Sequence, residues 1–97
     1  MTLFGDITKR LKEYRAAANG LLVDVREPEE YAAGHIPGAV NVPLSGIRSA
    51  SLPAGKLLFL YCLRGSRSKR AARILIKMGY PAKSIGGISG YRGAIEK

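Results

Sequence analysis

The sequence has few of the residues that hold small proteins together covalently or through metal ions. Its 97 residues include one cysteine, Cys62, and one histidine, His35. A single cysteine forms no internal disulfide and provides no thiolate cluster for zinc, so we expect no disulfide framework, no metal and no other cofactor. The thiol of Cys62 is therefore free to react.

Long apolar segments are also missing. No run approaches the ~20 apolar residues of a membrane-spanning helix, and Asp6 interrupts the N-terminus before a signal-peptide core develops. We therefore expect a cytoplasmic protein without membrane association. The 46% of hydrophobic and 24% of charged residues are typical of a globular chain. Its length predicts a single domain over residues 1–97.

Acidic residues are scarce, and the formal net charge is +9. All seven acids lie between Asp6 and Glu30 or at Glu96, whereas residues 31–95 contain ten Lys or Arg and no acid. Such a positive field raises the local concentration of anions, which include small anions, acidic proteins and nucleic acid. The alternative is a basic surface that serves only solubility.

The apolar pattern predicts an α/β protein. Strands are expected over 21–25, 39–42 and 57–61 and near 84–85, and helices over 6–18, 29–33, 44–51 and 68–78 and from about residue 88. The helix over 68–78 has an apolar face of Ala71, Ala72, Leu75 and Met78. Alternating strands and helices favour a parallel sheet with helices on both faces, whose ligand site lies beyond the carboxyl ends of the strands.

Cys62 lies at that edge, between the most apolar strand and the helix that follows. A free cysteine thiol with a pKa of ~8.5 is mostly protonated at neutral pH, so a nucleophilic cysteine needs groups that stabilise its thiolate. Backbone N–H groups and the dipole of the following helix can point at the sulfur. Arg64 and Arg67 add permanent positive charge. The loop is therefore suited to hold an anion beside a nucleophile.

Other loop residues fit the same interpretation. Gly65 can adopt a positive φ angle or allow the backbone to approach closely, and Ser66 or Ser68 can cap the helix. The alternative is a buried, inert thiol, which is the more common fate of a lone cysteine after a strand. The glycine and the two arginines that follow Cys62 within five residues favour the interpretation of Cys62 as a nucleophile.

The sequence resembles the rhodanese family from about residue 21 to residue 91. The matching segments are Asp-Val-Arg-Glu-Pro-Glu-Glu-Tyr at 24–31, Gly-His-Ile-Pro-Gly-Ala at 34–39, Asn-Val-Pro at 41–43, Tyr-Cys through Ser at 61–68, the Ala71-Ala72 helix that ends in Met-Gly-Tyr at 78–80, and Gly86-Gly87 to Tyr91. The combination in this order is specific, although each piece alone is weak.

The resemblance implies a rhodanese-like parallel sheet of four to five strands with helices on both faces. It implies a catalytic Cys62 and a six-residue loop whose amides hold the persulfide and the sulfur donor, with Leu63, Arg64, Gly65, Ser66 and Arg67 as substrate-binding residues. In related phosphatases and arsenate reductases this loop is one residue longer, which argues against those activities. The chain departs from the family at Leu63, where many sulfurtransferases have a charged residue, and the usual first strand is hard to find before the helix at Asp6.

The function implied is sulfur transfer from thiosulfate or a persulfide, through a persulfide on Cys62, to cyanide or a thiol. The alternative is a sulfur carrier or docking module that serves a partner protein. An acidic partner can dock on Lys69, Arg70 and Arg73; nucleic acid is not expected, because no aromatic residues lie among these cations.

Several further positions have structural interpretations. Asp24 and Arg26 can form an ion pair that braces the loop, a role to which we also assign Ser68. His35 lies in a glycine-rich turn and is expected to be structural, without a Cys–His dyad. Residues 86–90 are expected to form a turn beside the active edge, because they lack the spacing of a dinucleotide-binding motif.

Overall fold

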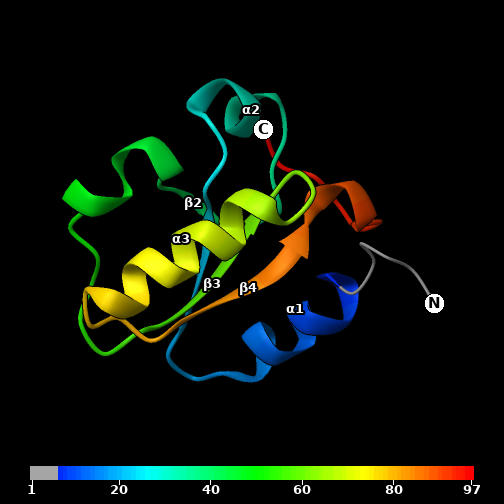
Figure 1. Cartoon of the computed structure of the whole chain (residues 1–97). Coiled ribbons are helices and arrows are strands. Elements are labelled where there is room, and N and C mark those ends of the chain that lie inside the picture. The colour runs from blue at the N-terminus through cyan, green and yellow to red at the C-terminus, as the bar shows by residue number, and fades with distance from the viewer. Residues whose placement is uncertain (1–6) are drawn as a thin grey trace.

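The computed structural model describes residues 7–97, which form a four-stranded parallel sheet with helices on both faces (Figure 1). The strand order is β2-β1-β3-β4. The strands are β1 (Gly20–Asp24), β2 (Val40–Asn41), β3 (Leu57–Cys62) and β4 (Ala82–Gly87). All three pairings are parallel, so the carboxyl ends of the strands meet at one edge.

The two central strands are the most apolar because both of their faces are covered. In β3, the five residues from Leu58 to Cys62 are buried, and in β1 the last three residues are buried. The sequence of such a strand is a continuous apolar run and does not alternate between apolar and polar residues. β2 and β4 lie at the two edges, where shorter or more polar sequences are tolerated.

Helices cover the sheet on both faces. On one face α3 (Ser66–Lys77) and the 3₁₀ helix η1 (Leu44–Ser49) pack over a cluster that includes Leu58, Leu60 and Leu75. On the other face α1 (Ile7–Ala16) packs over a cluster that includes Phe59, Tyr61 and Ile85. The alternation of β3 side chains between these two clusters follows from the two-residue period of a strand.

Helix α2 (Pro28–Ala33) lies beyond the carboxyl edge of the sheet (Figure 1). It begins with a capping box in which the Glu30 carboxylate accepts a hydrogen bond from the Glu27 backbone N–H at 3.0 Å. The chain then turns through His35, whose backbone pairs with that of Glu96. The C-terminal segment is thereby held next to α2.

The predicted fold class and the arrangement of helices on both faces are confirmed. Some details differ. The helix predicted over 68–78 begins two residues earlier, and Met78 is 42% exposed instead of inward-facing, because α3 ends at Lys77 and the chain turns at Gly79. The segment from residue 88 is one 3₁₀ turn, η2 (Ile88–Gly90), because Gly90 ends it.

The other boundaries differ only slightly. The strand predicted over 21–25 lies one residue earlier, and the segment predicted over 44–51 is a 3₁₀ helix that ends at Ser49. Four strands are found in residues 7–97; the position of a further first strand, like that of Asp6, lies outside the described residues. In the same part of the chain, no helix has the length and apolar character needed to span a membrane.

Candidate active site

Cys62 is the last residue of β3 and lies at the carboxyl edge of the sheet. Its side chain is 1% exposed. The sulfur accepts N–H hydrogen bonds from Gly65 at 3.0 Å and from Ser68 at 3.4 Å. Both donors lie at the start of α3, where free N–H groups and the helix dipole favour negative charge. The sulfur is therefore held by two backbone N–H donors at the N-terminus of a helix.

Two glycines allow the loop to close around this sulfur. Gly65 has a φ of +111°, a conformation that other residues adopt only with strain. Gly87 pairs with Cys62 in the sheet, and a Cβ atom there would lie 2.6 Å from the Cα of Arg64 and closer still to the carbonyl oxygen of Leu63. The glycines at 86 and 87 thus lie beside the edge that carries Cys62, as predicted, but they end strand β4, and the predicted turn is confined to Ile88–Gly90. The absence of a side chain at Gly87 gives the loop its space.

Ser68 ties the loop to strand β4. Its buried hydroxyl oxygen lies 2.6 Å from that of Ser84 on β4 and 3.1 Å from the carbonyl oxygen of Gly65. It also lies 3.6 Å from the sulfur of Cys62. The prediction that Ser66 or Ser68 caps the helix is wrong: α3 starts at Ser66 itself, and its N-cap is Gly65, which has no side chain to cap it.

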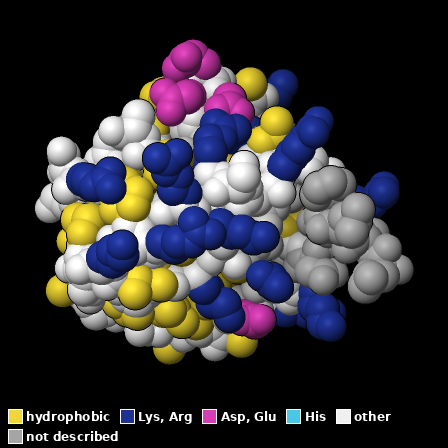
Figure 2. Space-filling model, viewed as in Figure 1, with side chains coloured by type: hydrophobic (Ala, Val, Ile, Leu, Met, Phe, Trp, Pro, Cys, Tyr) yellow, Lys and Arg dark blue, Asp and Glu magenta, His cyan; other side chains and the backbone are white. Residues whose placement is uncertain are grey.

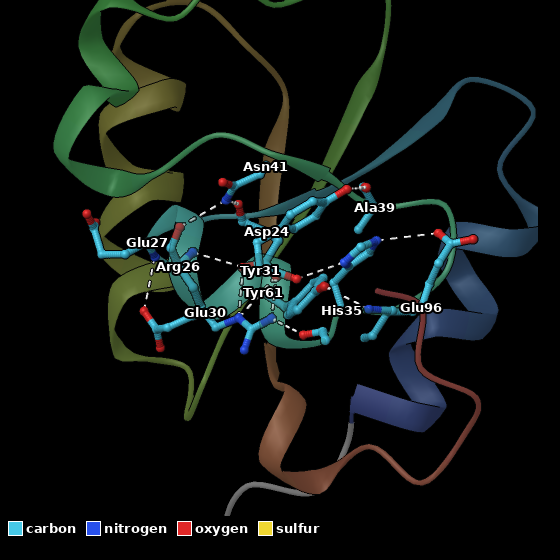
Figure 3. Close-up of polar contacts among 12 residues, drawn as sticks. Asp24, Arg26, Glu27, Glu30, Tyr31, His35, Ala39, Asn41, Tyr61 and Glu96 are labelled. Atoms are coloured by element: carbon cyan, nitrogen blue, oxygen red, sulfur yellow. Dashed lines mark hydrogen bonds and ion pairs between the residues drawn. The ribbon is translucent and has the colours of Figure 1, made fainter.

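Asp24 and Arg26 form a buried, bidentate ion pair at the end of β1 (Figure 3). The shortest contact, from the Arg26 Nη2 to the Asp24 Oδ2, is 2.7 Å. The same nitrogen donates to the carbonyl oxygen of Gly34 at 2.7 Å, and the guanidinium lies 5.9 Å from the ring centre of Tyr61. Within residues 7–97 no hydrogen bond joins the pair to residues 62–67. The pair therefore fastens β1 to the end of α2 and to the residue before Cys62.

Arg67, predicted to bind the sulfur donor, is held by Glu30 of α2. The guanidinium donates to both carboxylate oxygens, at 2.7 and 3.0 Å, and both side chains are about one-third exposed. The hydrogen bonds from Arg67 lower the pKa of Glu30 to about 2. No such contact was predicted for Glu30, because the two residues lie 37 positions apart in the chain.

Arg64 is the exposed cation of the loop. Among residues 7–97 no hydrogen bond or ion pair involves its side chain, so its charge is available to an anion at the mouth of the site. Leu63 beside it is 39% exposed. Of the two arginines predicted to bind the donor, Arg64 is therefore the better placed.

His35 contacts Tyr31 and Glu96 and, among residues 7–97, forms no hydrogen bond with the Cys62 thiol. Its ring stacks on Tyr31 with 3.7 Å between the ring centres, and its Nδ1 lies 2.9 Å from the carbonyl oxygen of Tyr31 (Figure 3). Its Nε2 lies 3.4 Å from a carboxylate oxygen of Glu96. No hydrogen bond between His35 and Cys62 occurs in the described part of the chain, which also contains no group of three His, Cys, Asp or Glu placed to bind a metal ion.

Comparison with known proteins agrees with the resemblance to the rhodanese family. Residues 7–94 match the family model for the rhodanese-like domain. The chain is 35% identical over 71 residues to the thiosulfate sulfurtransferase PspE of Escherichia coli, which covers 68% of each protein. It is 40% identical over 73 residues to YrkF of Bacillus subtilis, which is named as a proposed sulfur carrier; the match covers 73% of this chain and 39% of YrkF.

A solved structure of a sulfurtransferase has the same fold. The human single-domain sulfurtransferase TSTD1 superposes with a TM-score of 0.73 at 32% identity, over 86% of this chain and 89% of that protein. The first curated relatives are longer, and the chain spans about half of their length or less.

Proposed function

The chain belongs to the rhodanese-like domain family, and from this we propose that it is a sulfurtransferase in which Cys62 carries a sulfane sulfur as a persulfide. The observation that carries the proposal is the environment of Cys62. Its sulfur lies at the N-terminus of α3 and accepts hydrogen bonds from two backbone N–H groups. Such an environment stabilises a thiolate, and the same amides can stabilise the terminal sulfur of a persulfide.

In the first step the Cys62 thiolate attacks the outer sulfur of thiosulfate. A new S–S bond forms to Cys62, and the S–S bond of thiosulfate breaks with its electron pair remaining on the departing sulfite. In the second step cyanide or a thiolate attacks the outer sulfur of the persulfide, and the Cys62 thiolate is the leaving group. The reaction is nucleophilic covalent catalysis in two half-reactions and requires no cofactor.

The charges at the loop suggest how an anionic donor binds. Arg64 is unpaired within residues 7–97 and exposed, so it is the cation that we assign to the sulfonate end of the donor. Arg67 contributes less directly, because Glu30 already engages both of its terminal nitrogens. Asp24, Arg26 and Ser68 act as supports that keep the ends of β1 and β4 in place around Cys62.

The proposal is tested by measuring the intact mass of the protein after incubation with thiosulfate, beside a Cys62→Ser control. A gain of one sulfur atom in the unmodified chain only, lost on addition of cyanide, is the expected result. Steady-state kinetics should then give parallel double-reciprocal lines, as a two-step transfer requires. If the reduced protein gains no sulfur from thiosulfate or from persulfide donors, Cys62 is not a sulfur carrier.

A second candidate is a sulfur carrier that exchanges sulfur mainly with other proteins. Two observations favour it: the Cys62 side chain is 1% exposed, which limits access by free donors, and YrkF is named as a proposed carrier. Loading rates separate the two functions. Fast loading by a persulfidated protein together with slow loading by thiosulfate indicates a carrier, whereas rapid turnover of thiosulfate indicates an enzyme.

A further inference from the structure

A groove lies between η1 and the C-terminal half of α3, on the face of the sheet opposite α1. Its volume is about 390 Å³, within the usual range for small-ligand pockets. We call it the α3 groove; it is lined by Arg48, Arg73, Ile74, Lys77 and Met78. The lining thus combines three cations with two apolar side chains, and the catalytic loop contributes none of it.

The three cations of the α3 groove have no ion-pair partner among residues 7–97. Of the six acids in that range, three form ion pairs with Lys or Arg elsewhere in the chain, and Glu96 lies 3.4 Å from the His35 Nε2. The remaining two, Glu27 and Glu29, lie around α2. Figure 2 shows the same separation, with Lys and Arg side chains across the middle of the face over α3 and most of the acidic side chains visible in this view at the top. The groove therefore lacks an acidic complement within the described chain.

A row of cations connects the groove with the active edge. Lys69, Arg73 and Lys77 are exposed and follow one another at four-residue intervals, which places them along one side of α3. Neighbouring like charges weaken a helix, and cations in its first turns oppose its dipole. α3 contains no acid that would offset these effects. A surface that served only solubility would not need this arrangement, whereas a surface for an anionic partner does.

The apolar part of the groove narrows the choice of partner. Met78 is 42% exposed, and Ile74 is only partly buried. Two adjacent apolar side chains surrounded by cations match a peptide with both acidic and apolar residues. A nucleic-acid strand would favour aromatic platforms for its bases, and the groove lining contains none.

We propose that the α3 groove binds an acidic segment of a partner protein, with carboxylates facing the three cations and an apolar side chain packed on Ile74 and Met78. From this groove, the row that begins at Lys69 guides the partner toward the mouth of the Cys62 site. That the partner donates or accepts sulfur rests on the proposed function, whereas binding of the segment does not.

The proposal is tested by selecting short random peptides that bind the full chain and by measuring their affinities through fluorescence anisotropy. The test variants are Arg73→Glu/Lys77→Glu for charge and Met78→Ser for the apolar contact. The matched control is Lys9→Glu/Lys12→Glu, which makes the same change in net charge on α1, across the sheet. Circular dichroism checks folding, and sulfur loading of Cys62, measured by intact mass, checks the active site.

We expect selected peptides to be acidic with at least one large apolar residue. Arg73→Glu/Lys77→Glu should weaken binding at least about tenfold and Met78→Ser about threefold, while the control stays within about twofold and all variants load sulfur. Met78→Ser provides a test even if the double variant does not fold.

Three results overturn the proposal. The first is that the selected peptides lack acidic residues. The second is that the control variant loses as much affinity as the groove variant, which indicates attraction by net charge alone. The third is that single-stranded RNA binds through the groove cations and outcompetes every selected peptide. Failure of the unmodified chain to load sulfur would instead refute the proposed function and leave the peptide result standing.

Discussion

Gly87→Ala tests whether the loop after Cys62, which we propose to be catalytic, depends on its close approach to β4. The backbone at Gly87, with φ −130° and ψ 142°, is extended and suits alanine, so the substitution introduces no backbone strain. Space is the only obstacle, because the new Cβ would lie 2.6 Å from the Cα of Arg64, where ordinary contacts begin at 3.4 Å. The loop must therefore move by close to an ångström. Overpacking of this kind destabilises a protein by ~1–3 kcal/mol, and a ~1 Å displacement of reacting groups can slow a reaction ~10²-fold.

The assay is the rate of sulfur loading onto Cys62 together with urea unfolding. Gly46→Ala is the matched control, because among residues 7–97 no atom outside its own stretch of the chain lies within 4 Å of its added Cβ. We expect Gly87→Ala to load sulfur ~10²-fold more slowly and to unfold at lower urea, and Gly46→Ala to behave as the unmodified chain. Loading at the unmodified rate by Gly87→Ala, with an unchanged unfolding midpoint, would refute the dependence of the loop on β4.

Other substitutions test the charges around the site. Because Arg67 lowers the pKa of Glu30 from 4.5 to about 2, their ion pair stabilises the fold above about pH 4.5 and is lost as the pH falls toward 2. Urea unfolding should show Glu30→Gln less stable by about 1 kcal/mol at pH 7 and equal to the unmodified chain near pH 2. Arg26→Leu leaves the buried Asp24 carboxylate without its partner and should cost ~3–5 kcal/mol of unfolding free energy; Asp24→Leu/Arg26→Leu should be more stable than Arg26→Leu. Arg64→Ala should raise the KM for thiosulfate about tenfold with little change in kcat, as expected when uniform binding is lost.

The main features of the fold were predictable because they depend on local sequence. β1 and β3 are short apolar runs with turn-forming flanks, and such runs predict buried strands without reference to the rest of the chain. The amphipathic pattern likewise identified α1 and α3. The pattern failed at Met78, because an apolar residue at helical spacing faces the core only while the helix continues, and α3 ends at Lys77.

The supports of the site were less predictable. Glu30 has a complete local explanation as an acid in the first turn of α2 that closes a capping box, so nothing in its neighbourhood indicates that it also binds Arg67. Ser84 and Gly87 likewise read as members of an ordinary strand and turn. Their contacts with Ser68 and with the loop exist only because β4 pairs with β3, a long-range relation that a local pattern does not specify.

The loop residues were predictable from local sequence and their supports were not, and this difference has a physical cause. The free N–H groups of a helix lie within its first turn, so the residues that donate to the Cys62 sulfur must follow it closely in sequence. The residues that fix the position of that turn come instead from α2 and β4, as Glu30 and Gly87 do. A chain can therefore keep the spacing from Cys62 to Arg67 and still lose the geometry on which the proposed reactivity of the sulfur depends. It follows that substitutions at Glu30 and Gly87, which leave the loop sequence intact, separate the chemistry of the loop from its placement more cleanly than substitutions within the loop.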